Sequence, residues 1–220
     1  MKDIPVFDTP TGVSTLILKE IPYAQTAYII VQSVQPECMQ EHLTECVSFC
    51  RMCGAERILA SGHPNLEAWP LRCRIIPMAC ALMTEEKPPA NLFPVTGETV
   101  SKWRSIYNER MSGVDNAATL TAFDEKKILA SGGAYFVHRD GELLGIGWME
   151  GSEVRCIAAV KRGTGEQVLR TLMTVADSDR VTLEVASTNH RAIRLYEKLG
   201  FFPCGEGKSW HTVWERGERP

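Results

Sequence analysis

The order of apolar and polar positions divides the chain into alternating strands and helices. In the first part, four segments rich in β-branched and apolar residues are predicted strands: residues 15–20, 27–34, 56–61 and 72–82. Between residues 37 and 53 the apolar positions recur at the spacing of an amphipathic helix, and Gly54 follows where a helix C-cap belongs. The pattern therefore predicts a ββαβ(α)β unit.

A polar stretch without periodicity, TEEKPPAN at residues 84–91, contains two adjacent prolines and is the best candidate for a linker. We therefore expect an N-terminal α/β domain at residues 1–83 and a second domain at residues 92–220.

The second part begins with one short strand and two helices and continues as three strands separated by turn residues. Helices are predicted at residues 100–111, 121–130, 163–176 and 189–199. Strands are predicted at residues 92–95, within 132–160, and at 181–186 and 201–214. An antiparallel meander followed by alternating strands and helices implies an α/β fold (α+β mixed sheet) with parallel crossovers.

The two parts share an order of elements. Residues 27–82 run strand, helix, strand, helix, strand, as residues 154–214 do. The first part is thus either a degenerate copy of the second or an unrelated βαβ arrangement, since such units are common.

Composition and charge narrow the function. The 220 residues are 44% hydrophobic and 23% charged, with a formal net charge of −3. This is the profile of a soluble globular protein, and it gives no electrostatic signature for nucleic acid or an anionic membrane. No apolar run is long enough to span a bilayer, and the start, MKDIPVFDTP, does not resemble a signal peptide. We expect a cytoplasmic protein with neither a nucleic-acid nor a membrane partner.

Eight cysteines are many for such a chain. A disulfide framework is not expected in the cytoplasm. Cys46, Cys50 and Cys53 have the spacing of the cluster ligands in radical S-adenosylmethionine enzymes, which leaves an iron–sulfur enzyme as one hypothesis. However, these three cysteines share the apolar stripe of the helix predicted at residues 37–53, where a free cysteine serves as a small hydrophobe. Core packing is therefore favoured and no metal is expected.

Candidate chemistry begins at VKRGTGEQVL, residues 160–169, where a Gly-x-Gly turn joins a strand to a helix. Gly163 and Gly165 permit a sharp turn that directs amide hydrogens at the helix N-terminus toward an anion such as a pyrophosphate. A plain strand-to-helix connection would also need glycines, so this turn alone does not decide.

A second motif follows at the expected distance: STNHRAIRLYEKLGFFPCGE, residues 187–206. Asn189 caps a helix that Gly200 ends. The two motifs together resemble the GCN5-related N-acetyltransferase (GNAT) superfamily over residues 92–214. The resemblance implies a GNAT-like acyl-CoA N-acyltransferase fold in which acetyl-CoA lies in a gap between two central strands that splay apart.

The resemblance also implies site residues. The pantetheine arm and thioester carbonyl would contact the strand end at Ala158, Ala159 and Val160. The pyrophosphate would lie on the turn formed by Arg162, Gly163, Thr164, Gly165 and Glu166. Asn189 and the backbone near Ala192 would contact acetyl-CoA from the other side. This chain has Val160 where the family has Gln or Arg, three residues before the first glycine.

For catalysis, the resemblance assigns Tyr196 as the general acid for the departing sulfur and Glu184 as the base. The alternatives are a buried aromatic residue and a structural partner of an arginine. Other candidate bases are Glu150, Glu153 and His138, and acceptor binding is expected from residues 108–121.

The sequence thus predicts an enzyme that transfers an acetyl group from acetyl-CoA to a primary amine by direct attack. The partner is a small-molecule or peptide amine, and a homodimer is compatible with the sequence. Val160 and the short Gly-rich segment motivate an alternative, a non-catalytic acyl-CoA-binding GNAT-like module.

Overall fold

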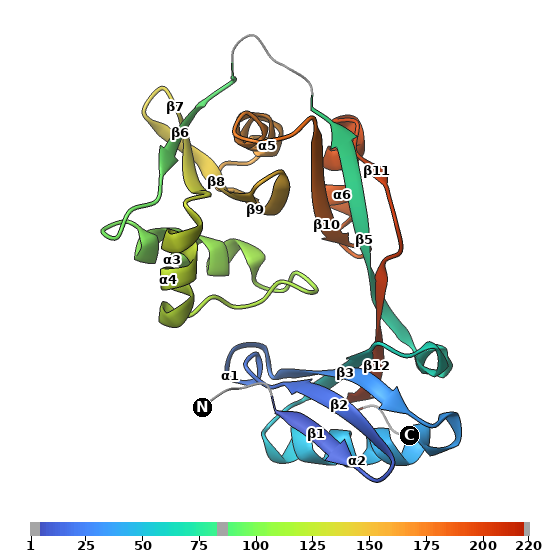
Figure 1. The fold of residues 1–220 in the computed structure, drawn as a ribbon. Helices are drawn as coiled ribbons and strands as arrows, with labels where there is room; N and C mark the ends of the chain where they lie inside the picture. The colour runs from blue at the N-terminus through green and yellow to red at the C-terminus, as the bar shows by residue number, and fades with distance from the viewer. Residues whose placement is uncertain (1–4, 83–87, 218–220) are drawn as a thin grey trace. The chain divides into compact units, whose positions relative to one another are not determined.

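The computed structural model describes residues 5–82 and 88–217 and divides the chain into two compact units. Unit 1 comprises residues 1–75 and 207–220, and unit 2 comprises residues 76–206 (Figure 1). This division differs from the expected one, because strand β5 (Leu71–Ala81) continues from unit 1 into unit 2 and the last strand belongs to unit 1. Residues 84–87 of the expected linker lie outside the described residues.

Unit 1 contains a mixed sheet with the strand order β1-β2-β3-β4-β12-β5. Besides the first part of β5, its strands are β1 (Val6–Thr9), β2 (Gly12–Ile17), β3 (Thr26–Val34), β4 (Arg57–Ser61) and β12 (Lys208–Glu215). Its helices are α1 (Ile21–Ala24), η1 (Pro36–Cys38), α2 (Met39–Met52) and η2 (Pro64–Ala68). The prediction missed β1 and α1, and it placed β2 three residues late, because these short elements carry little periodicity.

The cysteine stripe on α2 is only partly as predicted. Cys46 and Cys50 are fully buried with Leu43, whereas Cys53 is the C-cap residue of α2 and is exposed. Burial raises the pKa of Cys46 to about 11 and that of Cys50 to about 12. Both buried residues are therefore neutral thiols that pack as small hydrophobes.

In unit 2 the strand order is β6-β7-β8-β9-β10-β5, with β11 paired to β5, and these strands belong to the same hydrogen-bonded sheet as those of unit 1 through the shared strand β5. The other strands of unit 2 are β6 (Asn91–Pro94), β7 (Ala134–Arg139), β8 (Glu142–Glu150), β9 (Glu153–Ala159), β10 (Arg180–Ala186) and β11 (Phe202–Pro203). Its helices are α3 (Val100–Met111), α4 (Ala122–Ser131), α5 (Gly165–Met173) and α6 (His190–Lys198). The single strand predicted at residues 201–214 is thus two strands, β11 and β12, which lie in different units.

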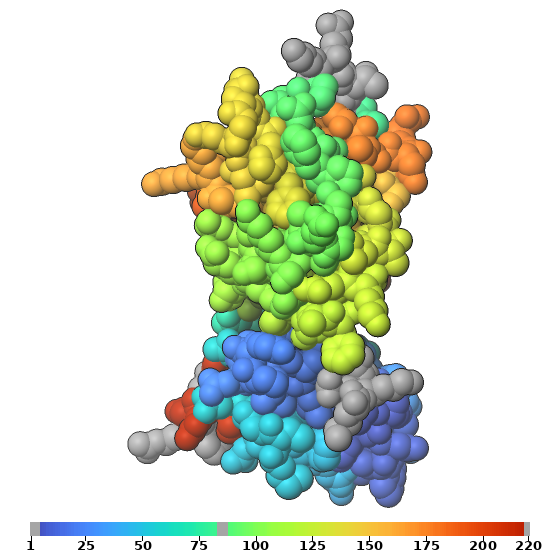
Figure 2. All heavy atoms as spheres, turned by 90° about the vertical axis from the view of Figure 1, so that its left-hand side faces the viewer, coloured from blue at the N-terminus to red at the C-terminus, as the bar shows by residue number. Residues whose placement is uncertain are grey.

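The helices of unit 2 cover opposite faces of its sheet. One cluster joins α3 and α4 to β7, β8 and β9, and another joins α5 and α6 to β5 and β10 (Figure 1). The atoms of α3, the loop that follows and α4, coloured green to yellow-green, form a continuous layer on the first face (Figure 2). On the other face, a Cβ atom on Gly147 of β8 would lie 2.7 Å from Leu172 of α5. A side chain at position 147 would therefore require the fully buried Leu172 side chain to shift.

The two units share a plan. The order β1, β2, β3, α2, β4, η2, β5 in unit 1 matches β7, β8, β9, α5, β10, α6, β11 in unit 2. In each unit, the last two strands of this series are separated by a strand from elsewhere in the chain: β12 lies between β4 and β5, and β5 lies between β10 and β11. This correspondence supports the interpretation of the first part as a degenerate copy.

Candidate functional site

The expected gap between two central parallel strands is present in unit 2. β9 and β10 pair only over the first two residues of β9, Glu153 with Thr182 and Val154 with Leu183. The rest of β9 continues to pair with β8 on its other edge, through Ala159 and Gly145. Beyond Val154, β9 therefore stays paired with β8 on one edge, and its other edge has no register partner in β10.

Unit 1 lacks such a gap at the corresponding place. Its parallel strands β3 and β4 pair from Thr26 with Arg57 to Ile30 with Ser61, which is the whole length of β4. The connection after β3 contains Pro36, whose nitrogen carries no hydrogen, and it has no Gly-x-Gly turn like that of residues 163–165. The site predicted from the sequence is therefore confined to unit 2.

The Gly-rich turn after β9 is held by hydrogen bonds to Leu144 of β8. The Val160 amide donates to the Leu144 carbonyl at 2.9 Å, and the Thr164 hydroxyl donates to the same oxygen at 2.9 Å. Gly163 has φ of +88°, a left-handed conformation that favours glycine. Gly165 begins α5, where a Cβ atom would lie 3.1 Å from Leu195 of α6. The turn is thus fixed, and the two glycines have different roles.

Charges around this turn suit an anion. Arg162 is exposed and has no ion pair with another described residue. Glu166 accepts from Lys198 of α6 at 2.5 Å and from Arg170 at 3.2 Å, and these contacts, the Lys198 hydrogen bond most of all, lower its pKa. The Glu166 carboxylate is therefore neutralised within the protein and ties α5 to α6. Backbone amides and Arg162 remain as the groups that could hold a pyrophosphate.

Asn189 caps α6 as predicted. Its side-chain oxygen accepts from the Ala192 amide at 3.2 Å. This amide consequently already has a partner inside the protein, so any contact that Ala192 makes with acetyl-CoA would use other atoms. The roles of both residues toward acetyl-CoA stay predictions.

Tyr196 lies in the core between α6 and the sheet. Its ring centroid is 5.8 Å from that of Phe201. Burial first, and then Cys156, raises the pKa of Tyr196 well above its usual value. The phenol therefore keeps its proton at neutral pH, which a general acid requires. The electrostatic effect of Cys156 indicates that Tyr196 lies near the part of β9 that follows Val154, where the pairing with β10 ends.

Glu184 lies on the other face of β10. Its neighbours Leu183 and Val185 are buried with α5 and α6, so the alternation of the strand directs Glu184 to the face that carries α3 and α4. Glu184 is exposed, and no arginine among the described residues pairs with it. The alternative of a structural partner for an arginine is thus not supported.

The other candidate bases have partners. Arg155 pairs with Glu150 at 3.6 Å and with Glu153 at 2.6 Å. The His138 ring packs edge-on against Phe93, with ring centroids 5.2 Å apart. These contacts support structural roles for all three candidates.

Two contacts fix the loop between α3 and α4. The sequence singled out no individual residue of this loop for acceptor binding. The Asn108 side chain accepts from the Leu120 amide at 2.9 Å and donates to the Leu120 carbonyl at 2.8 Å. Farther along, the Thr188 hydroxyl donates to Asp115 at 2.7 Å. Because Thr188 follows β10, the second contact holds the loop against the end of the strand that carries Glu184. No sequence signal linked Asp115 to Thr188, which lies 73 residues away.

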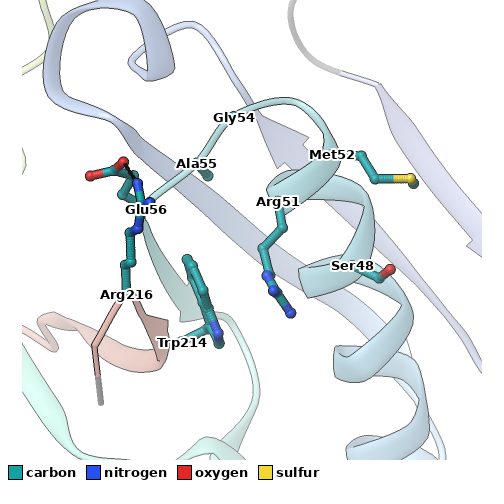
Figure 3. A pocket seen from close by; sticks show the side chains of 8 residues that line it. All are labelled: Ser48, Arg51, Met52, Gly54, Ala55, Glu56, Trp214 and Arg216. Atoms are coloured by element: carbon teal, nitrogen blue, oxygen red, sulfur yellow. Dashed lines mark hydrogen bonds and ion pairs between the residues drawn. The ribbon is translucent and has the colours of Figure 1, made fainter. Parts of the chain in front are cut away.

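Unit 1 contains a cavity of about 590 Å³ beside the end of α2. The Arg51 guanidinium lies 4.7 Å from the centre of the Trp214 ring, and Glu56 pairs with Arg216 across from it (Figure 3). None of the residues predicted for the acetyl-CoA site lines this cavity. It is therefore a separate feature of unit 1.

No group of three or more histidine, cysteine or acidic side chains among the described residues gathers in a way that could hold a metal ion. Within residues 5–82 and 88–217, no helix has the length and apolar character to cross a membrane.

Comparison with known proteins agrees with this architecture. Residues 97–201, from just before α3 to just before β11, match the acetyltransferase (GNAT) family. No curated protein sequence matches the chain.

Solved structures extend the likeness to nearly the whole chain. A GCN5-related N-acetyltransferase from Sphaerobacter thermophilus has a TM-score of 0.58 at 13% identity, with 94% of this chain and 78% of that chain covered. A GCN5-related N-acetyltransferase from Kribbella flavida has a TM-score of 0.56 at 14% identity, with 96% of this chain and 90% of that chain covered. A tandem GNAT protein from the clavulanic acid biosynthesis pathway has a TM-score of 0.53 at 14% identity, with 96% of this chain and 83% of that chain covered. The fold is therefore GNAT-like across both units.

Proposed function

We propose that this protein is an N-acetyltransferase that moves an acetyl group from acetyl-CoA to a primary amine by direct attack. The observation that carries the proposal is the parting of β9 and β10 after the Val154–Leu183 pair, with the phenol of Tyr196 near enough to Cys156 of β9 for an electrostatic effect. The acceptor is a small-molecule or peptide amine.

In this mechanism, the main chain of Ala158 to Val160 orients the thioester, and Arg162 with the amides of the turn binds the pyrophosphate. Glu184, directly or through water, takes a proton from the ammonium group of the acceptor. The amine nitrogen attacks the thioester carbon, the carbon–sulfur bond breaks, and Tyr196 donates its proton to the departing sulfur, after which the second proton lost by the nitrogen restores the Tyr196 phenol. The products are the N-acetyl amine and CoA, and no redox partner is needed.

The cytoplasm is the proposed location. All eight cysteines are free thiols, as a reducing compartment would keep them. Purification under reducing conditions should therefore preserve whatever activity the protein has.

The test is incubation with acetyl-CoA and a panel of primary amines, with the N-acetyl products and CoA separated and quantified by mass spectrometry. Thiol reagents are unsuitable because Cys53 is exposed. We expect product formation that falls about 100-fold or more in Glu184→Gln. Tight acetyl-CoA binding without turnover of any amine would instead identify the alternative, a non-catalytic acyl-CoA-binding module.

A further inference from the structure

A buried tryptophan beside the site has an unsatisfied hydrogen-bond donor. Trp148 of β8 is 8% exposed. Its indole nitrogen is the only buried side-chain nitrogen or oxygen among the described residues that has no hydrogen-bond partner. Leaving a buried N–H unpaired destabilises the fold, and such groups in native proteins usually have a functional partner or a bound water.

The neighbouring Trp103 shows that an indole N–H in this cluster can find a hydrogen-bond acceptor. Trp103 of α3 packs edge-on against Trp148, with ring centroids 6.1 Å apart, and donates its N–H to the Tyr135 carbonyl at 3.0 Å. The two rings belong to the same core cluster. The unpaired N–H of Trp148 is thus a property of one position rather than of the whole cluster.

The position of Trp148 connects it to the reacting groups. Trp148 is the register partner of Cys156 on β9, so their side chains share one face of the sheet. Cys156 lies two residues beyond Val154, where β10 parts from β9, and it is near enough to Tyr196 to raise the pKa of that phenol. Trp148 is therefore one strand away from the beginning of the gap.

The face also decides which substrate Trp148 could meet. Trp148 lies on the side of α3 and α4, where the loop tied to Thr188 and the side chain of Glu184 also lie. The Gly-rich turn leads instead into α5, which covers the opposite face. An amine approaching the thioester from the α3 and α4 side would have Glu184 and Trp148 near it.

We infer that the acceptor carries a carbonyl or carboxylate oxygen close to its amino group, as amino-acid derivatives and peptide N-termini do, and that the Trp148 indole N–H binds this oxygen. The inference rests on the proposed function and narrows its substrate class. Lys127 of α4, whose ammonium lies 5.8 Å from the centre of the Trp148 ring, adds positive charge beside it. Simple alkylamines and polyamines lack the oxygen that would satisfy the indole.

The first test compares glycinamide, triglycine and propylamine as acceptors in the wild-type protein and in Trp148→Phe, which keeps an aromatic ring and removes the N–H. We expect kcat/KM for glycinamide or triglycine to fall about tenfold in the variant, while propylamine and the KM for acetyl-CoA stay unchanged. Amine basicity cancels because the same amines are compared in both proteins. The glycinamide and triglycine arms distinguish a small acceptor from a peptide.

The control is Trp103→Phe, which removes a satisfied N–H from the adjacent ring. We expect it to lower the melting temperature, whereas Trp148→Phe leaves the melting temperature unchanged or raises it. A second measurement uses the NMR signals of the five indole N–H groups, with the Trp148 signal identified by its absence in Trp148→Phe. This signal should move downfield when glycinamide is added together with CoA.

The outcomes separate the two ideas. Equal loss for all three amines, a change in acetyl-CoA affinity alone, or an indole signal that does not move, as with a permanently bound water, would overturn the role of Trp148 and leave acetyl transfer standing. Acetyl-CoA binding without turnover of any amine would overturn both.

Discussion

The hydroxyl of Thr188 donates a 2.7 Å hydrogen bond to the carboxylate of Asp115, which joins the loop between α3 and α4 to the end of β10. The same loop is closed at its base by the paired hydrogen bonds between Asn108 and Leu120. The geometry of unit 2 on the side of α3 and α4 thus depends on contacts between segments that are distant in sequence.

Breaking this contact should affect the acceptor more than the fold. We expect Asp115→Ala and Thr188→Val each to raise the KM for the acceptor several-fold, because a displaced loop no longer positions the amine. The free energy of unfolding should change by less than about 1 kcal/mol, since the hydrogen bond is exposed. Steady-state kinetics and denaturant titration measure the two quantities.

The double variant provides the control. If the hydrogen bond is what matters, the double variant should have a KM close to that of either single variant. Strictly additive effects would show that Asp115 and Thr188 act independently.

Tyr196→Phe should lower kcat by about 100-fold or more while the affinity for acetyl-CoA stays the same. Phenylalanine keeps the packing against Phe201 and removes only the acidic proton. Because the pKa of Tyr196 is raised, the wild-type rate should show no loss from deprotonation of this group up to about pH 10, its ordinary pKa. Tyr23→Phe, at an exposed tyrosine in unit 1, is the matched control. An unchanged kcat in Tyr196→Phe would remove the phenol from the mechanism.

Unit 1 should lose stability in mild acid. His42 is fully buried, with one ring nitrogen 2.8 Å from the Ser14 hydroxyl and the other 3.1 Å from the Thr9 hydroxyl. Burial lowers its pKa, and Glu45 opposes this effect only partly. The unfolded chain therefore binds a proton near pH 6.5 that the folded protein does not, and stability is complete above that pH and falls below it.

The measurement is the melting temperature of the wild type and His42→Gln between pH 8 and pH 5. The wild type should lose more stability than the variant as the pH falls from about 7. If the core cannot accommodate glutamine at this position, pH-dependent hydrogen exchange of β2 and α2 in the wild type provides the same comparison. Parallel curves for the two proteins would contradict a role for His42.

Gly147→Ala should destabilise unit 2 by about 1–3 kcal/mol, because the new Cβ would lie 2.7 Å from Leu172 and push α5 away from β8. Gly97→Ala is the control, since nothing lies within 4 Å of a Cβ at that position. Thermal denaturation of both variants measures the difference. Equal melting temperatures would show that α5 can shift without loss.

Division of the chain at residues 84–91 should give two fragments that fold only together. Residues 92–220 lack β5, the strand between β10 and β11, and residues 1–83 lack β12, the strand between β4 and β5. Each fragment alone leaves unpaired strand edges. Co-expression should yield a soluble complex, and circular dichroism should show little structure in either fragment alone. A fragment that is a stable folded monomer would contradict this dependence.

Local patterns in the sequence were sufficient for the elements and for the family of the second part. The spacing of apolar residues predicted α2, α3, α4 and α6, and the glycine and LYEKLGF motifs indicated the GNAT fold that the comparisons confirm. These features depend on neighbours within a few residues, so the sequence alone is sufficient to predict them.

Only the tertiary structure decided the pairing of strands, the unit to which each belongs, and the partners of the candidate residues. The parting of β9 from β10, the return of β12 to unit 1, the bond between Asp115 and Thr188 and the unpaired indole of Trp148 all join segments far apart in sequence. Such contacts depend on sheet register and on packing between faces, which no local pattern specifies.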